Sequence, residues 1–317
     1  MKTTYINLGA IFLKLGSTLL KVVKSAKVIK TGLIIGSVGA YSYLFSWQMG
    51  VALTAMLIVH EYGHVWAMKK RGMKVKGMYL IPFLGAVAVP DENFPTREVE
   101  SYTAIMGPIW GGLFSLAMLV LYFITENIIF AGIASLMAFI NLFNLFPVNP
   151  LDGGRILKSI FLSIHNTIGI GIFTLISFLA IGISIFQGYS LLVLVLILGL
   201  FELIGEYIAI KSLEKDLGGK ESIKWIKQWK AVKYHNGKDP IKDFLKDNYH
   251  RTELLDKLAS IKELEENTKI IKPDMTTKEI ITYTTAYLLV AIFLIAIMVY
   301  ADNIPGADIA LKMLKGE

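Results

Sequence analysis

Apolar residues in this chain gather into blocks of about twenty, separated by shorter polar stretches. A helix of about twenty apolar residues is long enough to cross the hydrocarbon core of a bilayer. The pattern therefore predicts an all-α polytopic membrane protein with about seven transmembrane helices. We place these spans near residues 31–47, 50–68, 101–125, 128–148, 167–187, 190–210 and 280–300.

Residues 73–90 do not fit the pattern of a span, although much of this segment is apolar. Glycines and prolines divide it into short pieces, which favours a β-hairpin or a re-entrant loop after the second span. Non-helical backbone is tolerated at membrane depth only where protein or a water-filled cavity covers it. We therefore expect a short element that is covered in this way.

Three further segments lie outside the spans. Residues 1–30 hold six lysines and no acidic residue, which favours an amphipathic helix on an anionic cytoplasmic leaflet. Residues 211–279 are rich in Lys, Glu and Asp and predict a cytoplasmic helical segment. Within it, Trp225 and Trp229 share one helical face, either as a small core or as a surface that docks a partner or the membrane. Residues 301–317 form an extracytoplasmic tail in this scheme.

The basic residues are distributed unevenly between the connections. Those after the second, fourth and sixth spans carry lysines and arginines, whereas those after the first, third and fifth carry none. By the positive-inside rule, the N-terminus is cytoplasmic and residues 31–210 form a six-span core in the cell membrane. The net charge of +7 follows this topology and forms no single stripe, so lipid is an expected partner and nucleic acid is not.

Composition supports a membrane protein and limits its chemistry. Of the 317 residues, 54% are hydrophobic and 18% are charged, and the mean hydropathy is +0.57. These values exclude an ordinary cytosolic enzyme, a disordered chain and a collagen-like rod. The chain has no cysteine, which excludes disulfides, a thiol nucleophile, iron–sulfur clusters and thiolate-bound zinc. Any metal must therefore be held by His, Asp or Glu.

The second span carries the sequence HEYGH at residues 60–64. Side chains four residues apart lie on one helical face, so His60 and His64 can reach one metal ion, with Glu61 beside them as a candidate base. Zinc suits imidazole and keeps one position open for water in catalytic sites. Ionisable residues inside a span are costly, which favours function, although a polar network joining helices is the alternative. The other histidines fit a polar cap or a solvated surface: His165, His235 and His250.

A catalytic zinc site needs a third protein ligand. Asp152 follows Pro147 and Pro150 and precedes two glycines, so a break after the fourth span could bend its carboxylate back toward the bundle. Two alternatives stay open. Asp152 could cap a helix that begins near Ile156, and Glu202 in the sixth span could be the ligand instead, although pairing within the bundle would also explain Glu202.

Two separated motifs resemble the site-2 protease family of intramembrane zinc metalloproteases. One is HEYGH inside a span, and the other is NLFPVNPLDG at residues 144–153. In addition, GPIWG at residues 107–111 resembles the small-residue signature of that family's third span. The resemblance covers about residues 50–160. No PDZ-like domain interrupts the spans and nothing resembles paired CBS modules, so the resemblance leaves residues 211–279 and the seventh span unexplained.

The resemblance implies a role for each site residue. His60, His64 and Asp152 would be the metal ligands and would hold one Zn²⁺ per chain. Glu61 would be the catalytic acid/base, and Asn144 would help to hold the substrate or the developing oxyanion. Zinc would polarise a water molecule, and Glu61 would take its proton and pass it to the leaving amine.

The implied function is an intramembrane zinc metalloendopeptidase that cleaves membrane-anchored proteins within or near the bilayer, in regulated intramembrane proteolysis. The expected partners are a transmembrane protein or peptide substrate and a regulatory membrane protein, with the active site nearer the cytoplasmic side. A substrate helix must unwind before it is cut, because it satisfies its own backbone hydrogen bonds. Residues 79–90 could hold the unwound piece as an added strand.

Two rival functions remain at this stage. The first is an integral-membrane zinc protease whose third ligand is Glu202. The second is a catalytically silent membrane scaffold or regulator that retains the motif. The intact Glu61 argues against the second, since a silent relative has no need of the base.

Overall fold

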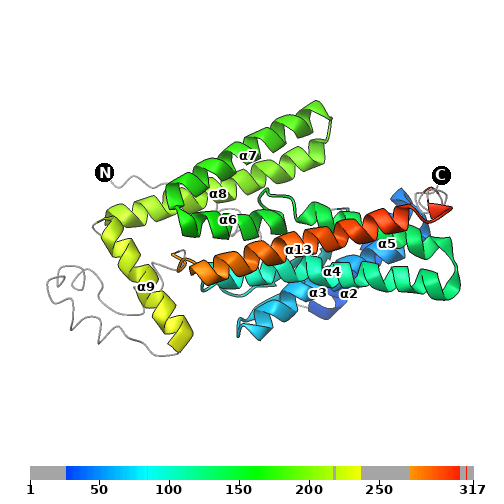
Figure 1. Ribbon diagram of the computed structural model, residues 1–317, viewed down its shortest axis with the longest axis horizontal. Helices are drawn as coiled ribbons and strands as arrows, with labels where there is room; N and C mark the ends of the chain where they lie inside the picture. Colours follow the sequence, from blue (N-terminus) through cyan, green and yellow to red (C-terminus); the bar gives the residue numbers. More distant parts are fainter. Residues whose placement is uncertain (1–25, 84, 217–218, 237–270, 308–311, 313–317) are drawn as a thin grey trace. The chain divides into compact units, whose positions relative to one another are not determined.

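The computed structural model describes residues 26–83, 85–216, 219–236, 271–307 and 312. This part of the chain is mostly helical, with one small antiparallel sheet (Figure 1). In chain order the elements are α2 (Ala26–Leu44), α3 (Trp47–Lys70), β1 (Val75–Ile81), β2 (Gly85–Pro90), α4 (Arg97–Thr125), α5 (Ile128–Asn144), α6 (Asp152–Ile164), α7 (Asn166–Phe186), α8 (Ser190–Asp216), α9 (Lys220–Asn236) and α13 (Thr277–Asp302). A helix lies at each predicted span.

Among the described residues, four helices are long and apolar enough to cross a membrane, namely α4, α7, α8 and α13, and α5 is apolar but shorter. α2 and α3 coincide with the first two predicted spans, but they are not among the helices that are long and apolar enough to cross a membrane. In α3 the reason is chemical, because the HEYGH sequence and the lysines of its last turn lower its hydropathy. A polytopic membrane architecture agrees with these helices, and the count of seven spans stays a prediction.

The element predicted for residues 73–90 is a β-hairpin. β1 and β2 pair in antiparallel register, with Ile81 opposite Gly85. In the connecting turn, Phe83 and Gly85 have φ values of 66° and 104°, a region that glycine adopts without strain. The hairpin contacts both α2 and α3. It therefore lies beside the helix that carries HEYGH.

The chain divides into two compact units. Unit 1 comprises residues 1–91, 105–146 and 287–317, and unit 2 comprises residues 92–104 and 147–286. α4 and α13 each contribute residues to both units. The predicted N-terminal amphipathic helix, His250 and much of the predicted soluble segment lie outside the described residues, so the predicted domain boundaries stay predictions.

The core of unit 1 joins α2, α3 and α5. At its start, α3 is capped by the Ser46 side chain, which accepts a hydrogen bond from the Met49 amide at 3.2 Å. Gly50 lets α2 approach α3 closely, because a Cβ at this position would collide with Ser42. The buried side chains of this core are Tyr41, Met49, Ala52, Leu53, Met56, Ile133 and Met137. Their packing sets α3 against α5.

In unit 2, α6 packs on α7, α7 packs on α8, and α8 contacts α9 (Figure 1). Trp225 and Trp229 are buried and stacked, with ring centroids 6.3 Å apart. The core interpretation of these two indoles is therefore confirmed. His165 precedes α7 and its Nδ1 accepts a hydrogen bond from the Ile168 amide at 3.3 Å, which confirms its role as a polar cap. His235 is exposed at the end of α9.

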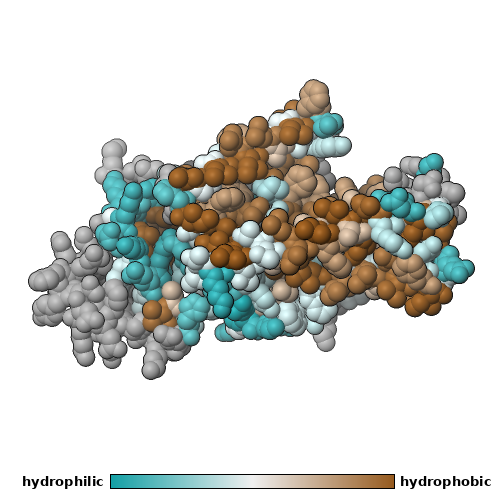
Figure 2. Space-filling model, viewed as in Figure 1, coloured by the Kyte–Doolittle hydropathy of each residue, from teal (hydrophilic) through white to brown (hydrophobic). Residues whose placement is uncertain are grey.

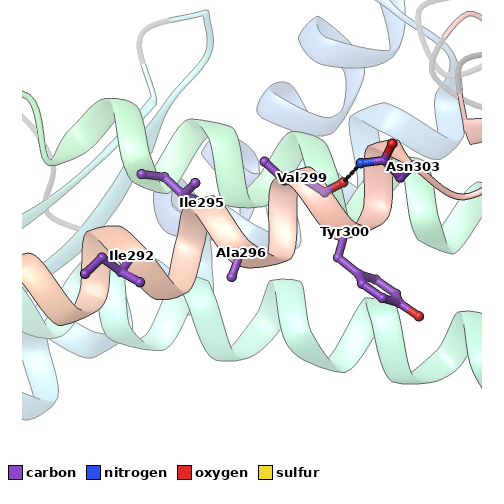
Figure 3. Close-up of a pocket in the computed structure, with 6 residues that line it drawn as sticks. All are labelled: Ile292, Ile295, Ala296, Val299, Tyr300 and Asn303. Carbon is purple, nitrogen blue, oxygen red and sulfur yellow. Dashed lines mark hydrogen bonds between the residues drawn. The ribbon is translucent and has the colours of Figure 1, made fainter.

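The outer surfaces of α7 and α13 are apolar, whereas α9 is hydrophilic (Figure 2). A shallow groove of about 510 Å³ runs along one side of α13, and its lining residues come from that helix and from Asn303, which directly follows it (Figure 3). At its end, the Asn303 side-chain amide donates to the Val299 carbonyl in the last turn of α13 at 2.8 Å. Apolar faces of this extent suit contact with lipid. The lining residues are Ile292, Ile295, Ala296, Val299, Tyr300 and Asn303.

Candidate metal centre

The two histidines of HEYGH lie on one buried face of α3. His60, Glu61 and His64 are 3%, 8% and 5% exposed. The Nε2 atoms of His60 and His64 lie 3.1 Å apart. In a tetrahedral zinc site with Zn–N bonds of about 2.0–2.1 Å, two ligand nitrogens are separated by about 3.3 Å. The helix therefore presents two imidazole nitrogens at the separation that one zinc ion needs.

A residue that the sequence analysis missed completes this arrangement in unit 1. The Nδ1 atom of His60 lies 2.8 Å from Oδ1 of Asn141, which is fully buried on α5. The other end of the same amide donates to the Met137 carbonyl at 2.7 Å. An amide in the middle of an apolar span is itself a signal of function, and it could have drawn attention to Asn141.

Asn144, the residue indicated by the family resemblance, is the last residue of α5 and is half-buried. It follows Asn141 by three positions, so the two side chains share one face of the helix. Its predicted contact with substrate stays a prediction.

Glycines of α4 form the wall of the site in unit 1. A Cβ on Gly107 would collide with the imidazoles of His64 and His60, and a Cβ on Gly111 would collide with the amide of Asn141. Both glycines belong to the GPIWG sequence. Their missing side chains let α4 cover the two histidines and the amide directly with backbone.

Neighbouring aromatic residues pack around this wall. Trp110 meets Tyr62 edge to face at 5.2 Å between ring centroids, and it lies 6.1 Å from Trp66. Gly63 allows the contact between the two helices, because a Cβ there would collide with the Met106 carbonyl. These aromatic rings thus hold α3 against α4.

Asp152 lies in unit 2 as the first residue of α6 and is buried. The N-cap position belongs to Leu151 and makes no side-chain hydrogen bond, so the interpretation of Asp152 as a cap for a helix near Ile156 is wrong. The helix begins four residues earlier than that alternative assumed. Within unit 2 the Asp152 carboxylate lies 3.9 Å from the Arg155 guanidinium.

The turn that precedes Asp152 is compact. Pro147 and Pro150 follow the end of α5, and the Asn149–Pro150 peptide bond is cis. The side-chain amide of Asn149 donates to the Gly199 carbonyl at 3.3 Å. A Cβ on Gly154 would collide with the carbonyl of Val148. This segment holds the start of α6 in one place within unit 2.

Glu202 has a different environment from the other candidate ligands. Its side chain is 58% exposed and lies 3.7 Å from the Lys158 ammonium group, which is 1% exposed. Burial alone would lower the pKa of Lys158, but the carboxylates of Glu100, Glu206 and Glu202 raise that pKa above its ordinary value. Pairing with Lys158 accounts for Glu202 without a metal.

Lys158 belongs to a larger set of ion pairs in unit 2, which we call the ionic cluster. Its shortest pair joins Lys272 to Glu100 at 2.6 Å. Arg97 is buried and lies 3.4 Å from Asp274 and 3.8 Å from Glu206. The members of the cluster come from α4, α6, α8, α9 and residues 271–276: Arg97, Glu100, Lys158, Glu202, Glu206, Lys227, Lys272 and Asp274.

The donor set agrees with zinc. His60, His64 and Asp152 are all buried, and each offers one ligand atom, an imidazole nitrogen or a carboxylate oxygen. Two imidazoles and a carboxylate are typical protein ligands of a catalytic zinc ion. A ligating histidine usually donates its second ring N–H to an oxygen acceptor, and Oδ1 of Asn141 is such an acceptor for His60.

Residues 48–131 match the family model of peptidase family M50. The chain is also similar to Zinc metalloprotease MJ0392 of Methanocaldococcus jannaschii, with 33% identity over 115 residues that cover 35% of this chain and 33% of the relative. It is 31% identical to Stage IV sporulation protein FB of Bacillus subtilis over 116 residues, which cover 35% of this chain and 39% of the relative. The chain thus spans about a third of the length of these curated relatives. The residues that match the family model include nearly all of α3, the hairpin and α4, but not Asp152.

Proposed function

The chain carries a domain of peptidase family M50, the site-2 protease family, and on this premise we propose that it is an intramembrane zinc metalloendopeptidase. The observation that carries the proposal is the pair of buried imidazole nitrogens 3.1 Å apart on α3, with Glu61 between them in the sequence. The proposed substrates are membrane-anchored proteins, cut within or near the bilayer. The apolar helices α4, α7, α8 and α13 support this location.

His60, His64 and Asp152 are the proposed ligands of one zinc ion per chain. Two neutral imidazoles and one carboxylate leave a coordination position for water. Zinc, when bound, supplies a Lewis acid and an acidified water. The burial of all three side chains supports the assignment, since dry surroundings strengthen the interaction of a carboxylate with a cation.

Glu61 is the proposed acid/base. It neighbours His60 in the sequence and is buried like the histidines, so its carboxylate would lie beside the proposed metal position. Glu61 would take a proton from the attacking water and pass it to the leaving amine. Asn144, on the same face of α5 as Asn141, is proposed to donate a hydrogen bond to the substrate carbonyl as negative charge develops there.

The hairpin is the proposed holder of the unwound substrate. β1 and β2 pair only with each other within the described residues, so each strand has an outer edge that can add a third strand. A proline cannot donate a backbone hydrogen bond. Proline substitutions scanned through residues 85–88 should therefore reduce cleavage at the positions whose amides point outward and leave the zinc content unchanged. Unchanged cleavage throughout would reject this role.

The proposed orientation places the N-terminus and the active site toward the cytoplasm, in a multi-pass protein of the cell membrane. The basic residues at the C-terminal end of α3, Lys69 and Lys70, are exposed and support this orientation. A regulatory membrane protein is a proposed further partner. Regulated intramembrane proteolysis is the corresponding class of process.

Cleavage in isotopically labelled water tests the proposal. The full chain would be reconstituted into vesicles with membrane proteins of its own host, in H₂¹⁸O, and new carboxyl termini that carry ¹⁸O would be identified by mass spectrometry. We expect labelled termini within or next to transmembrane segments. Glu61→Gln should reduce them by about 10²- to 10⁴-fold, and Tyr62→Phe, a control at the next position, should not.

The outcomes separate the rival functions. Equal labelling with the parent chain and the Glu61→Gln variant would overturn the protease proposal and favour the silent scaffold. Glu61-dependent labelling confined to soluble domains would retain the protease and reject the intramembrane substrate.

A further inference from the structure

We infer that Asn141 is a positioning residue for the metal centre, whose side-chain oxygen fixes the tautomer and the orientation of the His60 ring. The inference rests on the proposed zinc site. Neither the sequence motifs nor the family resemblance points to Asn141, since the motif begins at Asn144. All of the contacts that carry it lie within unit 1.

The side chain of Asn141 contacts His60 directly. Oδ1 of Asn141 lies 2.8 Å from Nδ1 of His60, and both side chains are buried. This distance is that of a well-formed hydrogen bond. The two residues are 81 positions apart in the sequence. The bond therefore joins α3 to α5 at the histidine that begins the motif.

The two ends of the Asn141 amide have different partners. The Nδ2 group of Asn141 donates to the Met137 carbonyl at 2.7 Å, one turn earlier in α5. An amide nitrogen can donate there but a side-chain oxygen cannot, so this bond fixes which end of the amide faces the imidazole. Oδ1 can only accept. The proton of a neutral His60 must therefore reside on Nδ1, and Nε2 keeps its lone pair.

The lone pair on Nε2 of His60 lies on the side of the ring that faces His64. Nε2 of His60 faces Nε2 of His64 at 3.1 Å. A neutral imidazole binds a metal through the nitrogen that carries no proton. Asn141 thus selects the tautomer in which His60 offers a metal the nitrogen that His64 also faces. Without this partner, the ring could place its proton on either nitrogen.

The His60 ring and the Asn141 amide are both covered by α4. α4 covers both of them, because a Cβ on Gly107 would collide with the imidazoles and a Cβ on Gly111 would collide with Asn141. The amide is thus held by its bond to Met137 on its own helix and by the backbone of α4. It offers His60 a fixed acceptor rather than one of several rotamers.

An amide also suits the charge of the site. Carboxylates often accept the hydrogen bond from a ligating histidine. Here the charges of a zinc ion, Asp152 and Glu61 already balance, and a further buried carboxylate would add a charge that nothing offsets. A neutral amide supplies the same acceptor geometry without this cost.

Zinc affinity and histidine tautomer test the inference on the full chain in detergent micelles. Zinc would be titrated in competition with a fluorescent chelator. Asn141→Leu, which has no acceptor, should bind zinc about 10- to 100-fold more weakly than the parent chain. Asn141→Asp, which keeps an acceptor oxygen, should stay closer to the parent chain than Asn141→Leu does. Asn303→Leu is the matched control, because the exposed amide of Asn303 likewise donates to the carbonyl four residues earlier, and its removal should leave zinc affinity unchanged.

Nitrogen NMR supplies a readout that needs no variant at Asn141. The chain has five histidines, and His60→Gln identifies the signals of His60 in ¹⁵N-histidine-labelled protein. We expect His60 to be protonated at Nδ1 in both the zinc-free and the zinc-bound protein. A zinc-bound form with the proton on Nε2 of His60 would overturn the inference even if Asn141→Leu failed to fold.

The remaining outcomes are also distinguishable. If Asn141→Leu bound zinc as tightly as the parent chain, Asn141 would only connect two helices. This result would overturn the inference and leave the proposed protease function standing. Failure of the parent chain to bind zinc would instead overturn the proposed function.

Discussion

Two buried polar clusters stand in this apolar chain, and they satisfy their polar groups in opposite ways. In the ionic cluster of unit 2, charges pair with charges, as Lys158 does with Glu100 and Glu206. On α3 of unit 1, two imidazoles turn equivalent nitrogens toward each other, an arrangement that two neutral lone pairs do not favour without a proton or a metal between them. The first arrangement joins opposite charges, whereas the second brings together two ligand atoms that a proton or a metal ion can bridge.

The surroundings of the clusters differ in the same way. Long side chains surround Lys158 and meet it with their own charges. The imidazoles are instead covered by the backbone of α4 at Gly107, and the neutral amide of Asn141 contacts Nδ1 of His60. Mutual pairing among long charged side chains indicates a structural role. Convergent ligand atoms behind a wall of glycine indicate a site for a metal ion.

The largest expected effect concerns which acidic residue belongs to the metal site. Asp152→Ala should reduce bound zinc from about one ion per chain to nearly none, because removing one of three ligands opens the site. Glu202→Ala should keep its zinc, since Glu202 is exposed and pairs with Lys158. Elemental analysis of the purified chains measures both.

Asp152→Asn supports this experiment if the alanine variant folds poorly, because it keeps the shape of the side chain and removes the charge. The opposite result, with zinc lost in Glu202→Ala and kept in both Asp152 variants, would move Glu202 into the metal site. It would also break the distinction between the two clusters.

The next effect should appear in stability. Lys158→Met leaves Glu100 and Glu206 without their shared cation, and breaking a buried ion pair in this way costs about 3–5 kcal/mol. Chemical unfolding in micelles measures the loss. Zinc affinity of the folded fraction should be unchanged, because the ionic cluster is structural in our interpretation. A loss of zinc affinity without a loss of stability would contradict it.

Lys211→Met is the matched control for Lys158→Met. Lys211 pairs with Glu214 at 2.9 Å on the exposed surface of α8, where an ion pair contributes little, so we expect no measurable change in the free energy of unfolding.

The contribution of Lys158 to stability should be insensitive to pH in the neutral range. The pKa of Lys158 is raised above the ordinary 10.5, so its contribution is fully present below 10.5 and is lost only as pH rises through the higher folded value.

The sequence was sufficient to predict features whose signal is local. The spacing of His60 and His64 predicted one buried helical face with both rings together, and the glycines and prolines of residues 73–90 predicted a break that is a β-hairpin. Each of the seven long apolar blocks coincides with a helix of the structure, whereas α6 and α9 lie outside these blocks. Each of these signals lies within about twenty consecutive residues.

Features that depend on distant partners were missed. Nothing near Asn141 in the sequence shows that its amide meets a histidine 81 residues earlier. Lys158 and Arg97 were counted with the basic residues of cytoplasmic connections, yet both are buried in ion pairs. A buried charge and a solvated charge look alike until the partner is known, and here the partners lie on other helices.

The smallest expected effect tests the glycine wall that distinguishes the metal centre from the ionic cluster. Gly107→Ala adds one methyl group where it would collide with His64 and His60, and overpacking of this kind costs about 1–3 kcal/mol. Because the collision falls on the ligand atoms, zinc affinity should fall together with stability. Gly39→Ala in α2 is the control, since no atom lies within 4 Å of its added Cβ; it should leave zinc affinity unchanged and stabilise the helix slightly. If Gly107→Ala lowered stability but left zinc affinity unchanged, the close approach of α4 would contribute only to packing. The glycines of α4 would then no longer distinguish the metal centre from the ionic cluster.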